Sequence, residues 1–310
     1  MTGMTDLLPA EMPPPHIDPG AATEPAPDLI VIPDGDVPLV PNVGVIGGRD
    51  AVLVVDTGIG PGNGERLLEF ARERAAGRRI YLTTTHFHPE HAFGAEVFTR
   101  AGATWLVNRA QAEDLRDKGQ GYLEMFRGFG PVVEAELAGV QLVEPDEVYD
   151  GTRVLDLGGR TVELRPTGRA HTRGDQVVVV PDAGAVFGGD LVEAGRFAIF
   201  PWFPPHDTDA TGPGWIRVME GLVAEEFRIV VPGHGAPGGP ERLDVVLEHL
   251  RLLRDETWRR RDSAMPEEQI VAEVREVLSA AYPTWVGHEW IAAGVGCFCA
   301  EHTVRPEVTA

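Results

Sequence analysis

Residues 83–94 read TTTHFHPEHAFG and bring four potential metal ligands together: His86, His88, Glu90 and His91. Histidine accounts for only 10 of the 310 residues, so three of them between positions 86 and 91 need a reason. Neutral imidazole nitrogens and carboxylates are ligands for divalent metals, and crowding them without a cation costs desolvation and mutual repulsion. The stretch therefore predicts a metal site rather than a set of isolated structural histidines.

The same stretch lies where a strand ends and a helix begins. Upstream, RRIYLTTTH (78–86) alternates and then becomes β-branched, which predicts a strand ending near Thr84. Downstream, PEHAFGAEVFTRAG (89–102) has Pro89 at its opening turn and apolar residues at helical spacing, which predicts a helix. Loops at the carboxyl ends of strands are where α/β proteins assemble their sites.

The charge of the chain argues against nucleic-acid partners. Asp and Glu number 48 against 27 Lys and Arg, giving a formal net charge of −21 without any compensating basic run. Residues 1–28 are rich in Pro, Ala and acidic residues and do not have the pattern of a secretory signal, so they are predicted to form a disordered arm. No stretch approaches the roughly 20 apolar residues of a membrane span. A cytoplasmic protein without membrane or nucleic-acid partners is expected.

Strand and helix patterns alternate along the chain, which is typical of the α/β class. With 43% hydrophobic residues the chain can bury a large core, so residues 29–262 are predicted as one domain and 263–310 as a C-terminal helical extension. Two cysteines, Cys297 and Cys299, exclude a disulfide framework and are expected to be small buried residues.

Residues 109–138 have a mostly helical pattern that is interrupted by Gly119, Gly121, Gly128 and Gly130. Helices broken by paired glycines between two β-rich halves suggest a cap over a pocket. An ordinary packing insertion is the equal alternative.

Three more residues that can bind metals follow predicted strands: His171 in GRAHTRGD, Asp190 in VFGGDLVE and His234 in VVPGHGAP. Each is weak alone, since polar residues beside glycines are often turn residues. Their shared position after strands makes them candidates. In contrast, His249 and His302 match no motif, so Ala is expected to be tolerated at both.

Five motifs, in this order, resemble the metallo-β-lactamase-fold hydrolase superfamily, in particular its glyoxalase II-like and lactonase-like branch: VVDTG (54–58), THFHPEH (85–91), His171, GGD (188–190) and GHG (233–235). The resemblance implies an αβ/βα sandwich, in which two mixed β-sheets face each other with helices outside. It also implies a dinuclear metal site at one edge, which would make residues 29–262 the catalytic domain.

The resemblance assigns the ligands to two groups that share one carboxylate. The ligands of the first metal would be His86, His88 and His171. Those of the second would be Glu90, His91 and His234. Asp190 would bridge both metals, and Asp56 would orient a ligand from behind the site.

Glu90 departs from the family motif, which has Asp at this position. One added methylene moves a carboxylate by about 1.5 Å, whereas metal–oxygen distances tolerate only a few tenths of an ångström. The loop could shift to absorb the difference, the second metal could bind more weakly, or Glu90 could bind a water on the metal. We favour the first, because a vacant second site would leave His91, His234 and Asp190 unexplained.

A pair of divalent cations would make the protein a hydrolase. The cations would share a bridging hydroxide that attacks a small ester, thioester, lactone or lactam, while Asp190 or Glu90 carries the proton. Zinc is the first choice, and ligand sets without thiolate also suit iron or manganese. Two other functions stay open: an iron-dependent redox enzyme of the dioxygenase or di-iron type, and a non-catalytic metal-binding protein.

The small-molecule substrate is less well defined by the sequence. Trp202, Phe203 and His206 lie on a Pro-rich stretch shortly after the GGD motif, where they would line an apolar pocket or form a packed surface loop. Trp285 and Trp290 lie beyond the resemblance and would cover the pocket or form a contact in a homodimer.

Overall fold

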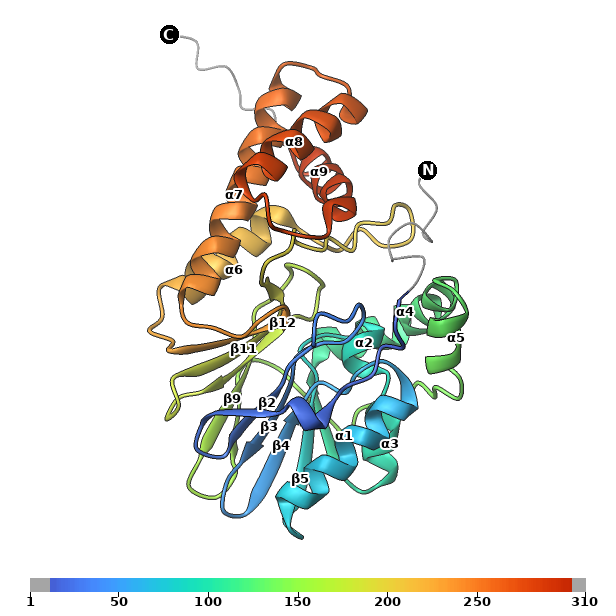
Figure 1. The fold of residues 1–310 in the computed structure, drawn as a ribbon, viewed down its shortest axis with the longest axis vertical. Coiled ribbons are helices and arrows are strands. Elements are labelled where there is room, and N and C mark those ends of the chain that lie inside the picture. Colours follow the sequence, from blue (N-terminus) through green and yellow to red (C-terminus); the bar gives the residue numbers. More distant parts are fainter. Residues whose placement is uncertain (1–11, 303–310) are drawn as a thin grey trace.

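The computed structural model describes residues 12–302, and in this range two β-sheets face each other with helices on their outer sides (Figure 1). The first sheet contains, in spatial order, β1 (Thr23–Ala26), β2 (Leu29–Ile32), β3 (Val43–Gly47), β4 (Ala51–Val55), β5 (Arg79–Thr83), β6 (Thr104–Asn108) and β7 (Glu147–Tyr149). The second contains, in spatial order, β12 (Ile229–His234), β11 (Ala185–Glu193), β10 (Gln176–Val180), β9 (Thr161–Pro166) and β8 (Arg153–Asp156). Both sheets mix parallel and antiparallel pairs. The αβ/βα sandwich is confirmed.

Strand β4 shows how the sequence builds these layers. Its residues AVLVV are all buried; Val52 and Val54 belong to the core beneath the helices, whereas Leu53 and Val55 belong to the core between the sheets. Successive strand side chains point to opposite faces, so a strand covered on both faces requires a continuous apolar run.

Helices cover the outer face of each sheet. Those that follow strands of the first sheet are α1 (Gly60–Ala75), α2 (Pro89–Ala92), α3 (Ala95–Arg100), α4 (Arg109–Arg127) and α5 (Pro131–Glu136). Those beside the second sheet are α6 (Gly212–Val223) and α7 (Glu241–Asp262). None of the helices in residues 12–302 combines the length and the apolar character that crossing a membrane would take.

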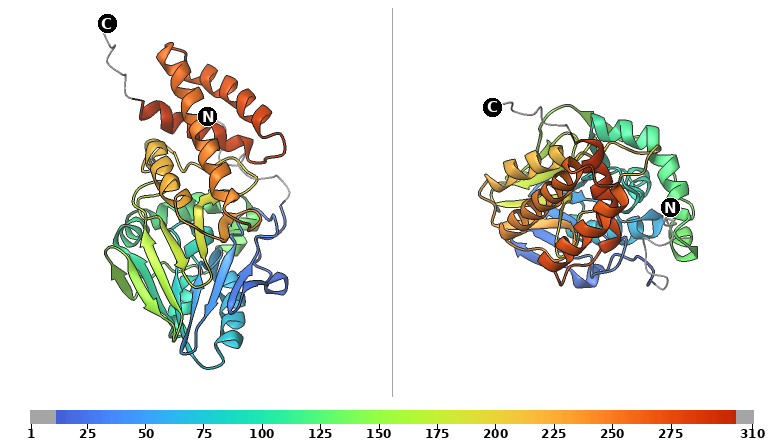
Figure 2. Two further views of the ribbon diagram at one scale, coloured as in Figure 1. Left: turned by 90° about the vertical axis from the view of Figure 1, so that its left-hand side faces the viewer. Right: turned by 90° about the horizontal axis from the view of Figure 1, so that it is seen from above.

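The C-terminal part is helical. It contains α8 (Glu267–Ala281), the short 3-10 helix η3 (His288–Trp290) and α9 (Ile291–Ala300). Helix α7 rises from the sandwich and packs against both α8 and α9, so it joins the two parts (Figure 2). Cys297 and Cys299 are free and buried in α9, as expected.

Two expectations about local structure are wrong. The predicted arm over residues 1–28 is ordered from residue 12, with η2 (Pro19–Ala21) and β1 within it, and residues 1–11 lie outside the described residues. The reason is Ile17, which is 2% exposed and whose N–H donates to Asn63 Oδ1 at 2.8 Å. Helix α4 also runs without interruption through Gly119 and Gly121, because tertiary packing outweighs the weak helix propensity of glycine. The break predicted at Gly128 and Gly130 is present, between α4 and α5.

Candidate metal centre

The loop after β5 carries the histidine-rich stretch, as predicted. His86 and His88 lie on the loop, while Glu90 and His91 lie in the first turn of α2, which Pro89 opens. All of these ligand candidates are buried. Buried imidazoles and carboxylates must find partners or a cation.

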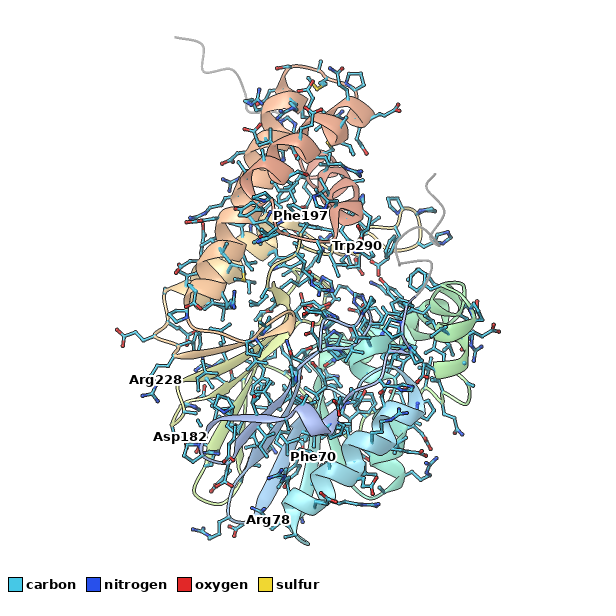
Figure 3. All side chains as sticks on the ribbon, viewed as in Figure 1. Phe70, Arg78, Asp182, Phe197, Arg228 and Trp290 are labelled. Carbon is cyan, nitrogen blue, oxygen red and sulfur yellow. The ribbon has the colours of Figure 1, made fainter. Side chains whose placement is uncertain are left out.

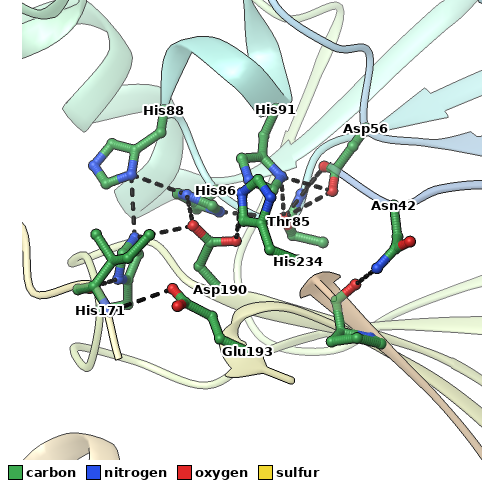
Figure 4. A network of polar contacts seen from close by, with 12 residues as sticks. Asn42, Asp56, Thr85, His86, His88, His91, His171, Asp190, Glu193 and His234 are labelled. Atoms are coloured by element: carbon green, nitrogen blue, oxygen red, sulfur yellow. Dashed lines mark hydrogen bonds and ion pairs between the residues drawn. The ribbon is translucent and has the colours of Figure 1, made fainter. Parts of the chain in front are cut away.

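The first group of candidate ligands contains His86, His88, His171 and Asp190, with one ligand atom of each lying within 4.8 Å of the others. His88 Nδ1 is 3.0 Å from His86 Nε2 and 3.1 Å from His171 Nε2. Nitrogens bound to one tetrahedral zinc ion are separated by about 3.3 Å, given Zn–N bonds of about 2.0 Å. These three nitrogens therefore have the spacing of a metal coordination sphere (Figure 4).

The second group contains Glu90, His91, Asp190 and His234. Asp190 Oδ1 is 3.1 Å from His91 Nε2 and 3.7 Å from His234 Nε2, and its other oxygen, Oδ2, faces the first group. Gly233 makes this approach possible, because a Cβ there would lie 2.0 Å from Asp190 Oδ1. One buried carboxylate thus stands between two separate ligand groups.

Neighbouring oxygens fix which nitrogen faces the site in three of the candidate histidines. His91 Nδ1 lies 3.0 Å from Asp56 Oδ2, and His171 Nδ1 and His234 Nδ1 lie 2.9 and 3.0 Å from the carbonyls of Ile199 and Val40. An Nδ1–H that donates outward leaves the Nε2 lone pair facing inward, as metal binding requires. Asp56 therefore lies where an orienting residue would be. The two carbonyls carry no sequence signal and were not predicted.

Glu90 Oε2 has no hydrogen-bond partner among the described residues, and the 3.1 Å contact between His91 Nε2 and Asp190 Oδ1 needs either a proton or a cation between the two atoms. Converging acceptors without donors repel one another, and leaving them unpaired costs free energy. A divalent cation in each group would remove that cost, and nitrogen and carboxylate oxygen are suitable donors for zinc. The residues present therefore fit two metal ions.

The protonation states of His86, His88, His171 and His234 agree with metal binding, whereas His91 would have to lose a proton to bind a metal ion. Burial lowers the pKa of His86 and His88 well below the usual value and that of His171 and His234 to about 4, which keeps these imidazoles neutral. Burial also lowers the pKa of His91, but the carboxylates of Asp190 and Asp56 outweigh it and raise the pKa overall.

The two candidate carboxylates differ in their surroundings. Burial raises the pKa of Glu90 to about 7, although His91 opposes the shift. At Asp190 burial also favours the neutral acid, but His91 and His234 outweigh it and hold the pKa well below its usual value. Asp190 therefore stays ionised at neutral pH, whereas Glu90 is close to its pKa there.

A cavity of about 280 Å³ opens above both groups, with His88, Glu90, Asp190 and His234 among its lining residues. Its other walls are mostly apolar and come from four segments. These are the loop after β2 (Asp36, Pro38, Leu39), α4 and the turn after it (Tyr122, Met125, Phe126, Phe129), the stretch after β11 (Arg196, Ile199, Pro201, Phe203), and the C-terminal segment (Val286, Gly287, Glu289, Trp290). In Figure 3, Trp290 and Phe197 lie where the C-terminal helices meet the sandwich. Helix α4 supplies one wall of the cavity.

Of the aromatic residues and the histidine that the sequence placed near the pocket, some line the cavity and others do not. Phe203 lines the cavity and so does Trp290. Trp202 instead packs against Gly296 of α9, and His206 is exposed; neither is among the lining residues of the cavity, so the packed-loop alternative describes these two residues. Trp285 packs on Phe197, at 5.6 Å between ring centroids.

Two residues that the sequence did not indicate support the site. Tyr122 stacks on the imidazole of His88, with ring centroids 4.9 Å apart. Glu193 is buried beside the first group (Figure 4) and accepts a hydrogen bond from the N–H of Ile199 at 3.4 Å. Neither belongs to a recognisable short motif.

An αβ/βα sandwich with histidine and carboxylate groups at one edge is typical of one class of metal-binding proteins. Comparison of the sequence with family models identifies this class. The family model described as the metallo-beta-lactamase superfamily matches residues 36–234. The match covers more than half of the chain, which therefore belongs to this superfamily.

Relatives and solved structures agree with this assignment. The acyl-coenzyme A thioesterase MBLAC2 of Homo sapiens is 29% identical over 223 residues, 65% of this chain and 75% of that protein. The metallo-beta-lactamase type 2 of Bacteroides fragilis is 22% identical over 219 residues, 69% of this chain and 76% of that protein. A metallo-beta-lactamase from Pontibacter korlensis superposes with a TM-score of 0.59 at 20% identity, over 74% of this chain and 98% of that one. The sec-alkylsulfatase Pisa1 from Pseudomonas sp. gives 0.68 at 14% identity, over 88% and 49%.

Proposed function

We propose that the protein is a metal-dependent hydrolase that cleaves thioesters with an apolar acyl group, using two divalent metal ions, with zinc as the first choice. The observation that carries the proposal is the place of Asp190, whose two oxygens face two groups of mostly neutral imidazoles beside an apolar cavity. When bound, the ions would lower the pKa of a water molecule and polarise the carbonyl of the substrate.

Each ligand group would hold one ion. The ligands of the first ion are proposed to be His86, His88 and His171. Those of the second are proposed to be Glu90, His91 and His234. Asp190 would contact both, and Asp56 would keep the Nε2 lone pair of His91 directed at the second ion through its 3.0 Å contact with Nδ1.

Glu90 is suited to move a proton during the reaction. Its Oε2 has no hydrogen-bond partner within residues 12–302, and the residue lines the cavity. It can therefore take up a proton from the attacking water and pass it toward the leaving group. A thiol has a pKa of about 8.5, so a thiolate leaves with little help from an acid.

The choice of a thioester rests on the cavity and on the relatives. The wall along α4 is formed by Met125, Phe126 and Phe129, which would accept an acyl chain. The MBLAC2 relatives, which are 29% identical, are acyl-coenzyme A thioesterases by name.

The test is hydrolysis by the zinc-loaded protein of an octanoyl thioester, its oxygen ester, a lactone and a β-lactam. We expect the thioester to have the highest kcat/KM, chelation to abolish turnover and zinc to restore it. Preferential cleavage of another class, or hydrolysis that survives metal removal, would contradict the proposal. Bound iron with oxygen consumption and no hydrolysis would indicate the redox alternative instead.

A further inference from the structure

Arg196 is the one Lys or Arg side chain among the residues that line the cavity above the candidate metal centre. Its guanidinium has few partners within the described residues. Its side chain is 17% exposed, and its Nε is buried with no hydrogen-bond partner in the described part of the chain. Among residues 12–302 one carboxylate approaches the guanidinium within 4 Å: Asp34, whose Oδ2 lies 3.7 Å from Nη2. That distance is too long for a hydrogen bond.

Asp34 is already engaged elsewhere. Its Oδ2 accepts the N–H of Gly235 at 2.7 Å, and its Oδ1 accepts the N–H of Asp36 at 3.2 Å. Asp36 and Glu289 also line the cavity, but neither carboxylate comes within 4 Å of Arg196. Because a mostly buried guanidinium with five donors is costly to leave unpaired, this one is available to a ligand.

The cavity is polar at one end and apolar at the other. Arg196 lies at the His234 end, because its neighbour Asp34 is bonded to Gly235, the next residue after His234. The opposite end is formed by Tyr122, which stacks on His88, and by the apolar residues that follow Tyr122 along α4. A substrate whose scissile bond lies between the two ligand groups would therefore present different chemistry to each end.

We infer that Arg196 binds a carboxylate in the leaving group of the substrate, close to the scissile bond, while the acyl chain lies along α4. The inference rests on the proposed thioester hydrolysis. Arginine matches a carboxylate with two parallel hydrogen bonds. The anion has to be close to the reacting atoms, because Arg196 lies beside the segment that carries His234.

A matched pair of substrates tests the inference: S-octanoyl-3-mercaptopropionate and its neutral amide, S-octanoyl-3-mercaptopropionamide. We expect the wild type to show a KM about 10- to 100-fold lower for the carboxylate, the scale of a hydrogen bond to a charged group. Arg196→Gln should remove this preference and Arg196→Lys should keep part of it. The control is Arg49→Gln, which changes net charge equally at a side chain that is 76% exposed and lies outside the cavity.

Binding of the non-hydrolysable thioethers, 3-(octylthio)propanoate and 3-(octylthio)propanamide, is measured in parallel by calorimetry. If neither thioester is cleaved but the wild type still binds the carboxylate more tightly and Arg196→Gln does not, the thioesterase proposal fails and the role of Arg196 stands. Cleavage of both thioesters without a preference, or a preference that survives Arg196→Gln, would overturn the inference. So would a preference for a carboxylate on the acyl chain.

Discussion

Shortening Glu90 to Asp probes how the second metal ion would be held. Glu90 is 7% exposed, and one of its carboxylate oxygens lies within 4.8 Å of the ligand atoms of His91, Asp190 and His234. Its Oε2 has no hydrogen-bond partner in the described chain. Glu90→Asp withdraws the carboxylate by about 1.5 Å, several times the tolerance of a metal–oxygen bond. The backbone cannot follow easily, because Glu90 is fixed in the first turn of α2.

The expected result is a second zinc ion bound about 10- to 100-fold more weakly, the usual effect of a disturbed metal-site shell. This corresponds to about 1.4 to 2.7 kcal/mol. The first ion should keep its affinity, because its histidines are unchanged. Competition with a chromophoric chelator measures the two affinities separately, and hydrolysis followed in the same titration should fall with loss of the second ion. Glu90→Gln serves as a control that keeps the length and removes the charge.

The result that would refute this reasoning is an Asp variant that binds the second ion as tightly as the parent or more tightly. Glu90 would then stand away from the metal, and the longer side chain would be a departure from the family motif without a compensating shift of the loop.

Three further changes test other parts of the site. Asp190→Asn should lower kcat by at least about 100-fold with an unchanged circular dichroism spectrum, because an amide bridges two cations poorly; near wild-type turnover would exclude its bridging role. Tyr122→Phe should lower the free energy of unfolding, measured in urea, by about 1 to 3 kcal/mol, because it removes the 2.8 Å hydrogen bond to Asp207. Zinc affinity should stay unchanged, because the ring still stacks on His88; weaker zinc binding would contradict this. His249→Ala should cost about 2 to 5 kcal/mol in unfolding free energy, since the ring is buried against Phe197 and accepts the N–H of Ala198. Burial lowers the folded-state pKa of His249 from 6.5 to about 3, so the neutral ring contributes its full stabilisation above pH 6.5. The difference in unfolding free energy between the wild type and the variant should therefore shrink as pH falls toward 3. A difference that grows in acid would contradict this reasoning.

His249 also shows what a motif cannot reveal. It matches no motif, so Ala was expected to be tolerated, yet its ring fills a core position between the sandwich and the C-terminal helices. That contact joins residues far apart in the chain, and no local pattern encodes it. His249 belongs to neither candidate ligand group, so the expectation that Ala leaves activity unchanged stays a prediction, whereas the burial of its ring makes us expect a loss of stability.

The candidate ligands could be predicted because each lies in a short motif within a strand or soon after one. The stretch 83–94 gives the strand, the loop and the start of the helix from local pattern alone, and the structure agrees, except that the predicted helix over 89–102 is divided at Gly94 into α2 and α3. Grouping the ligands around Asp190 required the resemblance, because it depends on contacts such as that of Asp190 with Gly233. The sequence distances involved, from Asp56 to His234, exceed what periodicity can describe.

The walls of the cavity were harder to predict for a physical reason. Aromatic residues near a ligand look alike in sequence whether they face the cavity or the neighbouring helix. Phe203 and Trp202 are adjacent, yet the first lines the cavity and the second packs on α9. Which one turns inward is decided by the C-terminal helices, whose position no pattern in the loop records.

The C-terminal segment is therefore part of the cavity rather than an appendage. The family model ends at residue 234, and all candidate metal ligands fall within it, whereas Val286 and Trp290 lie beyond it and line the same cavity. The N–H of Phe197 donates to the carbonyl of Val286 at 3.0 Å, and the N–H of Val286 donates to that of Gly195 at 3.2 Å. These bonds flank Arg196 and fix its backbone against the C-terminal segment. The part of the chain shared with the superfamily thus carries the candidate metal ligands, while residues outside it help to position the side chain that we assign to substrate recognition.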